Sequence, residues 1–178
     1  MNEVITYTDK EKQMLSLKQA VIDFTTSRPH DYFITLTTTR VISEDLIAEI
    51  LRRFIKIMNI ACFGRRSNKS IVVTPIIEKH KSDGAHVHLL MQDPRRRTET
   101  RSDIDLKQTV RDAWNKASSV TADVYRSSGG SEEWFKEVYD LKTLAGYLNK
   151  QINWDSVDSI DYGAYTGERR GEAPGLAY

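Results

Sequence analysis

The chain has 178 residues, of which 39% are hydrophobic and 29% are charged, and this length suits one domain with a single core. Its 26 Lys and Arg nearly balance its 25 Asp and Glu, so the net charge of +1 says little about partners. The single cysteine, Cys62, excludes an internal disulfide framework, and no apolar run reaches the roughly 20 residues that a membrane span needs. With no apolar signal core near its N-terminus, we expect a cytoplasmic protein that does not contact a membrane.

The first part of the chain predicts a strand between two helices. Residues 9–26 carry apolar side chains at loosely helical spacing, and DYFITLTTT, residues 31–39, has the aromatic and β-branched residues of a strand. Residues 43–63 predict a strongly amphipathic helix with Ser43 as its N-cap. Cys62 lies near the end of this helix, where packing explains a thiol better than catalysis does.

The middle of the chain predicts two strands, residues 70–80 and 85–92, joined by a tight turn. The turn Ser82-Asp83-Gly84 fits a three-residue hairpin loop in which the glycine takes the left-handed position. Pro75 has no backbone N–H to donate, which assigns the first of these strands to a sheet edge or a bulge.

The last part of the chain predicts further helices and strands. Residues 102–118 indicate an amphipathic helix capped by Ser102, residues 119–127 and 134–140 indicate strands, and residues 141–154 indicate a third core helix. The tail, residues 155–178, holds few core-forming side chains, and we expect it to be loosely ordered.

The resulting order is a helix, then β-α-β-β-α-β-β, then a helix. This order predicts an α+β fold of the ferredoxin-like class, with an antiparallel sheet of about five strands and helices packed on it. One domain would cover residues 1–154, with residues 1–28 as an N-terminal helical extension. In this topology the strand before the hairpin turn is an edge strand, which agrees with the position of Pro75.

The stretch GAHVHLLM, residues 84–91, places two histidines one residue apart in an apolar run. Because strand side chains alternate between faces, His86 and His88 share one face at roughly 7 Å from each other, close enough to bind one metal ion. His-x-His is also a short pattern that arises by chance, and a pair of satisfied core histidines is the other simple explanation.

The residues that face the histidines depend on the hairpin register. A three-residue turn sets Glu78 opposite His88 and His80 opposite His86, all on one face, whereas a loop of two or four residues turns Glu78 away. A set of two histidines and one carboxylate suits Mn²⁺ or Mg²⁺ as well as Zn²⁺.

The predicted third helix contains a tyrosine and a lysine at helical spacing. Tyr147 lies at the margin of the apolar stripe, and Lys150 follows at i+3 on the same side. A tyrosine at a core edge beside a solvated lysine explains this pair simply. A phenol can also form a covalent phosphoryl link, with the lysine stabilising the developing charge.

Three stretches, in this order, resemble the signatures of the HUH single-strand endonucleases. YFITLTTT is similar to their first motif, HVHLLM to the His-hydrophobic-His motif, and GYLNKQ to the Tyr-x-x-Lys motif on a helix. The resemblance spans residues 30–153 and implies the HUH endonuclease fold. It implies that His86, His88 and Glu78 bind a divalent metal, Mn²⁺ or Mg²⁺, with His80 as the other candidate for the third ligand.

The same resemblance implies that Tyr147 attacks a phosphodiester of single-stranded DNA, which gives a 5′-phosphotyrosine and a free 3′-hydroxyl, assisted by Lys150. Positions 143 and 151 are Thr and Gln, so the chain resembles the one-tyrosine replication initiators of rolling-circle plasmids and viruses. Without a Walker A sequence it would borrow unwinding from a host helicase, with a host polymerase as a further partner, and would act as a monomer or homodimer.

DNA contacts are expected from strand threonines and from basic clusters, which can mark phosphate-binding surfaces but are often only solvated loops. The candidates are Thr35, Thr37, Arg40, Arg65, Arg66, Arg95, Arg96 and Arg97. The alternatives to a nickase are a single-tyrosine transposase of the same fold, a non-catalytic ferredoxin-like module that binds single-stranded DNA or RNA, and a protein with a purely structural metal.

Overall fold

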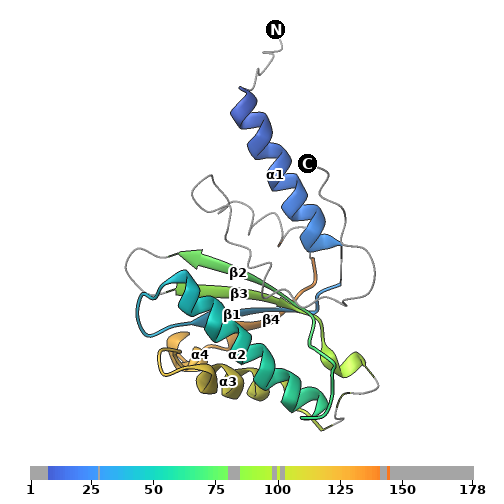
Figure 1. Cartoon of the computed structure of the whole chain (residues 1–178), viewed down its shortest axis with the longest axis vertical. Coiled ribbons are helices and arrows are strands. Elements are labelled where there is room, and N and C mark those ends of the chain that lie inside the picture. The colour runs from blue at the N-terminus through green and yellow to red at the C-terminus, as the bar shows by residue number, and fades with distance from the viewer. Residues whose placement is uncertain are drawn as a thin grey trace.

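The computed structural model describes residues 8–27, 29–79, 85–97, 100, 103–140 and 144 of the chain. Within them the elements are α1 (Asp9–Thr26), β1 (Tyr32–Thr37), α2 (Glu44–Phe63), β2 (Val73–Lys79), β3 (Ala85–Met91), the 3₁₀ helix η1 (Pro94–Arg96), α3 (Leu106–Ala117), α4 (Val124–Ser127), the 3₁₀ helix η2 (Glu132–Trp134) and β4 (Phe135–Glu137). Figure 1 shows the strands side by side as one sheet, with α2, α3 and α4 gathered on one side of it.

The strands form an open antiparallel sheet in the order β2-β3-β1-β4. Since β1 and β2 both run antiparallel to β3, they are parallel to each other with β3 between them, which is the split β-α-β arrangement. The fold is therefore α+β and consistent with the ferredoxin-like class. Its sheet has four strands in the described residues, where about five were expected. Pro75 lies on the edge strand β2, as predicted.

One face of the sheet is buried under the helices. On β1 and β3 every second side chain points to this face and is buried, and α2 adds an apolar stripe at helical spacing. Trp114 of α3 packs edge-on against Phe54 at 5.8 Å between ring centroids. Its indole Nε1 also donates to the carbonyl oxygen of Thr37 at 2.8 Å, so α3 is held to α2 by packing and to the interior strand β1 by a hydrogen bond.

The opposite face carries a smaller apolar cluster. Ile76 and Leu90 are buried there, and Leu17 of α1, Phe33, Val138 and Leu144 pack against them. Most described side chains of α1 are exposed, and Figure 1 shows this helix extending away from the sheet. No helix in the described ranges combines the length and the apolarity that crossing a membrane requires.

The two long helices were predicted with nearly their observed bounds, and both begin at a capping residue. The helix expected over residues 9–26 is α1, and Thr8 and Glu11 form a capping box at its start. The helix expected over residues 43–63 is α2, with the Ser43 side chain accepting from the backbone N–H of Leu46. These predictions are confirmed.

Two predictions in the second half were wrong. The N-cap of α3 is Asp105, whose side chain accepts from the backbone N–H of Gln108 at 3.0 Å, and not Ser102. The strand expected over residues 119–127 reduces to a single bridge between Thr38 and Thr121, followed by the short helix α4. Asp123 caps α4, and this local hydrogen bonding outweighs the β propensity of the neighbouring residues.

The hairpin register also differs from the prediction. β2 and β3 pair Lys79 with Ala85, Glu78 with His86 and Ile76 with His88, so residues 80–84 connect them. The expected pairing of Glu78 with His88 is thus wrong by two residues. The apolar pattern of two strands fixes only which face each side chain takes, and a shift of two residues leaves every face unchanged. Turn chemistry alone did not determine the loop length.

Candidate metal centre

The histidines lie on an interior strand, on the face that α2 and α3 leave uncovered. His86 opposes Thr37 of β1, and His88 opposes Thr35. Directly opposed residues in an antiparallel pair point to the same face. Both histidines and both threonines therefore share one face. The prediction that His86 and His88 lie on one face is confirmed, and their side chains are half-buried.

The ring of His88 is held from two directions. Its Nδ1 lies 3.3 Å from the hydroxyl oxygen of Thr35. The Phe33 ring stacks on the imidazole, with centroids 5.1 Å apart and planes inclined by 22°. Since Nδ1 faces Thr35, Nε2 is the nitrogen that would act as a metal ligand. Phe33 was not singled out from the sequence, although the alternation Phe33, Thr35, Thr37 on a predicted strand could have indicated it.

Beside His86, the hydroxyl of Thr37 is in an unusual position for a polar group. Its Oγ1 is buried and has no hydrogen-bond partner among the described residues. A buried hydroxyl without a partner costs about 1–3 kcal/mol. Such a group next to a half-buried histidine fits a face where a ligand oxygen is bound, because that oxygen would satisfy the hydroxyl.

Glu78 remains the candidate third ligand in spite of the corrected register. Its position on β2 is directly opposite His86, so the strand pairing assigns it to the histidine face. The side chain of Glu78 lies outside the described part of the structure, and so does His80. His80 is no longer expected opposite His86.

The donor types on this face fit a divalent cation. His86 and His88 are two residues apart on β3, which pairs with β2 on one side and β1 on the other. Glu78 of β2 is opposite His86. Among the side chains that the structure describes, no group of three or more His, Cys, Asp or Glu gathers in one place. Glu78 is the carboxylate residue that the strand pairing sets opposite His86, and a mixed nitrogen and oxygen set suits Mn²⁺ or Mg²⁺.

The segment with the predicted nucleophile begins at this face. Leu144 has a helical backbone, and its N–H donates to the backbone carbonyl oxygen of Asp140 at 3.1 Å. Its side chain packs against Ile76 and Leu90. Ile76 is the cross-strand neighbour of His88. Tyr147 and Lys150 lie outside the described residues, as do the rest of the predicted helix 141–154 and the tail 155–178.

The arginines that follow β3, which were expected to bind DNA, have hydrogen-bond or ion-pair partners within the protein. Arg95 donates to the Tyr32 hydroxyl at 2.7 Å and to Asp93 at 2.8 Å, and Arg96 pairs with Asp31 at 2.5 Å. Burial of the Asp93 carboxyl opposes its ionisation, but the hydrogen bonds and charge of Arg95 outweigh this and hold its pKa below the usual value. These groups join the start of β1 to the end of β3.

The other predicted DNA contacts are divided between the two ends of the sheet. Arg97 donates to the backbone carbonyl oxygen of Ser70 at 2.9 Å and lies over the Phe63 ring. Arg65 and Arg66 are exposed and follow the end of α2. Arg95–Arg97 follow Met91, which is roughly 17 Å from His86 along β3 at about 3.4 Å per residue. The exposed Arg40 follows β1 at the histidine end, close in sequence to Thr37.

Cys62 has the properties of a packing residue. Its side chain is fully buried in the core, and burial, with a smaller effect from the charge of Asp93, raises its pKa to about 11. The thiol is therefore protonated at neutral pH and is not a nucleophile under those conditions.

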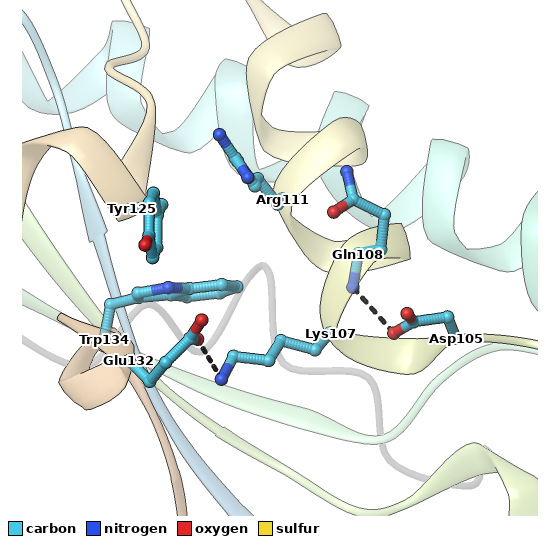
Figure 2. A pocket seen from close by; sticks show the side chains of 7 residues that line it. All are labelled: Asp105, Lys107, Gln108, Arg111, Tyr125, Glu132 and Trp134. Atoms are coloured by element: carbon cyan, nitrogen blue, oxygen red, sulfur yellow. Dashed lines mark hydrogen bonds and ion pairs between the residues drawn. The ribbon is translucent and has the colours of Figure 1, made fainter. Parts of the chain in front are cut away.

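A separate pocket of about 250 Å³ lies at α3, α4 and η2. Figure 2 shows its lining side chains, which are Asp105, Lys107, Gln108, Arg111, Tyr125, Glu132 and Trp134. Arg111 pairs with Asp123 at 2.9 Å and Lys107 pairs with Glu132, so acidic neighbours neutralise both cations. Trp134 belongs to the core beneath the helices, and the pocket is thus on the other side of the sheet from the histidines.

Comparisons of the chain with protein-family models, with curated proteins and with solved structures found no match. The resemblance to the HUH endonucleases therefore depends on the motifs and on their arrangement in the fold.

Proposed function

We propose that this protein nicks and joins single-stranded DNA in a metal-dependent reaction through a 5′-phosphotyrosine intermediate, and that it initiates rolling-circle replication of a plasmid or virus. His86, His88 and Glu78 would hold the cation, Tyr147 would be the nucleophile, and Lys150 would assist it. The sheet would then be of the HUH endonuclease type.

The observation that carries the proposal is that the first two motifs share one face of the sheet, and that Leu144, just before the third motif, packs on that face. β1 and β3 are adjacent, and Thr35 and Thr37 of the first motif pair with His88 and His86 of the second. Leu144, three residues before Tyr147, packs against the same face. Segments that are far apart in sequence thus lie beside each other, which supports a site built from all three motifs.

The chemistry follows from these residue types. The Tyr147 oxygen attacks the phosphorus of a phosphodiester and forms a P–O bond while the bond from phosphorus to the 3′ oxygen breaks. The phenolic proton leaves to solvent, and the departing 3′ oxygen takes up a proton. A bound divalent cation supplies Lewis-acid polarisation of a phosphate oxygen. Lys150 stabilises the charge that develops on the phosphate, and the reverse attack by a 3′-hydroxyl joins the strand.

DNA binding would draw first on the groups at the histidine end. Arg40 is exposed there and would contact phosphates, and the hydroxyl of Thr37 needs a partner that a phosphate oxygen would supply. Arg95, Arg96 and Arg97 have their own intramolecular partners, so we expect a smaller contribution from them. Unwinding of a duplex would come from a host helicase.

The test is a covalent-adduct assay with the full chain, Mn²⁺ and a labelled library of single-stranded DNA with a randomised centre. We expect a small fraction of the library to remain attached to the protein after denaturation, with the DNA on Tyr147 by mass spectrometry. Tyr147→Phe should lower the adduct at least 100-fold, because no other group replaces the phenolic oxygen as nucleophile.

Tyr139→Phe is the matched control, since Tyr139 is 90% exposed, contacts only Glu137 among the described hydrogen bonds, and precedes Tyr147 by eight residues. It should retain the adduct. A wild-type chain that gives no adduct from the library, or a Tyr147→Phe chain that still gives it, contradicts the proposal.

A further inference from the structure

The hydroxyl of Thr35 is placed to control the chemistry of His88. Thr35 is the direct cross-strand neighbour of His88, and its Oγ1 lies 3.3 Å from Nδ1. Thr35 is β-branched, so its χ1 angle is restricted and the backbone of β1 largely fixes the position of the hydroxyl. Phe33, two residues earlier on the same face, stacks on the imidazole and limits its tilt.

A neutral imidazole has one N–H and one lone pair, and the partner of one nitrogen decides which nitrogen carries the proton. If the Thr35 oxygen accepts from Nδ1–H, the lone pair is on Nε2, which is the form that binds a metal. Histidine ligands commonly make a second hydrogen bond of this kind, and its removal costs about 10- to 100-fold in metal affinity.

We infer that Thr35 is a positioning residue that selects the Nδ1–H form of His88 and so prepares Nε2 to bind a divalent cation. This inference rests on the proposed role of His88 as a metal ligand. It assigns Thr35 a role within the protein, in place of the DNA contact expected from the sequence.

Thr37 provides a matched comparison on the same strand. It opposes His86 as Thr35 opposes His88, but its hydroxyl has no partner in the described part of the chain. Replacing either threonine with valine keeps the shape and removes only the hydroxyl. A general effect of valine on this face would therefore change both variants alike, whereas a specific role of Thr35 would not.

The first experiment measures Mn²⁺ binding by titration calorimetry for the full chain and its variants. We expect Thr35→Val to bind Mn²⁺ about 10-fold more weakly than wild type. Thr35→Ser keeps the hydroxyl and should bind Mn²⁺ within about threefold of the wild-type affinity, and so should Thr37→Val. Equal affinities of wild type and Thr35→Val, or equal losses in the two valine variants, overturn the inference.

The second experiment needs no metal. Long-range ¹H–¹⁵N NMR spectra of the metal-free protein report which ring nitrogen of His88 is protonated. Wild type and Thr35→Ser should show the Nδ1–H form, and Thr35→Val should show a mixture, whereas an unchanged spectrum of Thr35→Val overturns the inference.

A separate variant tests whether His88 is a metal ligand. His88→Ala should lose Mn²⁺ binding, and if it binds as wild type does, His88 is not a ligand and the proposed function loses its metal centre. The NMR result on Thr35 is independent of that outcome.

Discussion

At the scale of single residues, the uncovered face of the sheet is specified by the alternation of side chains on two neighbouring strands. His86, His88, Thr35 and Thr37 could be assigned to common faces from the sequence because strand periodicity leaves no other choice. The hydrogen bond between Thr35 and His88 could not be predicted, because it depends on which residues pair across the strands. That pairing is a long-range property that no local pattern encodes.

The buried hydroxyl of Thr37 leads to a prediction about stability. Thr37→Val should raise the free energy of unfolding of the metal-free protein by about 1 kcal/mol, since it removes a buried group that lacks a partner. Thr38→Val is the control, because the buried Thr38 hydroxyl donates to the backbone carbonyl oxygen of Arg40 at 2.9 Å. This variant should lower the free energy of unfolding by about 1 kcal/mol. Urea denaturation measures both, and equal destabilisation of the two variants would show that the Thr37 hydroxyl is already satisfied.

At the scale of elements, the helices and strands that were predicted correctly are those with clear capping residues or apolar periodicity. The helices over residues 9–26 and 43–63 have clear N-caps, and the second has a continuous apolar stripe, so their bounds were found to within a residue. The segment 119–127 misled because its β-branched residues favour a strand, while Asp123 satisfies the backbone N–H groups of a helical turn instead.

Asp123 is therefore expected to determine the local structure around α4. Its carboxylate accepts from the backbone N–H groups of Tyr125 and Arg126 and from Arg111. Asp123→Ala should lower the stability at pH 7 by about 1–2 kcal/mol, and Asp123→Asn by less, because an amide oxygen still caps the helix. Thermal and urea unfolding at several pH values would measure this.

The pH dependence of that difference has a definite sign. The hydrogen bonds from Arg111 lower the pKa of the Asp123 carboxyl below its unfolded value of about 3.9. The carboxylate then contributes stability above about pH 4, and this contribution is lost as the pH falls through the folded pKa. Wild type and Asp123→Asn should thus become more alike below pH 4. A difference that is constant from pH 7 to pH 3 would show that the charge of Asp123 has no part in it.

At the scale of the whole molecule, the two faces of the sheet differ in composition. One face, under α2 and α3, holds most of the buried apolar side chains and provides the stability of the fold. Among the described residues, the other face has a small apolar cluster, beside which the histidines and the two threonines lie. The α+β class could be predicted because the order of elements admits few topologies. The number of strands was overestimated, because the β-branched segment 119–127 forms a single bridge and a helical turn in place of a strand.

The proposed activity of the protein depends on a cation bound at the histidine face. The most direct measurement is the anomalous difference density of a crystal soaked in MnCl₂. We predict a manganese peak bound by the Nε2 atoms of His86 and His88 and by the Glu78 carboxylate, with Tyr147 turned toward the same face. A well-ordered crystal with no peak at these histidines, or with manganese bound only at other residues, would contradict the account.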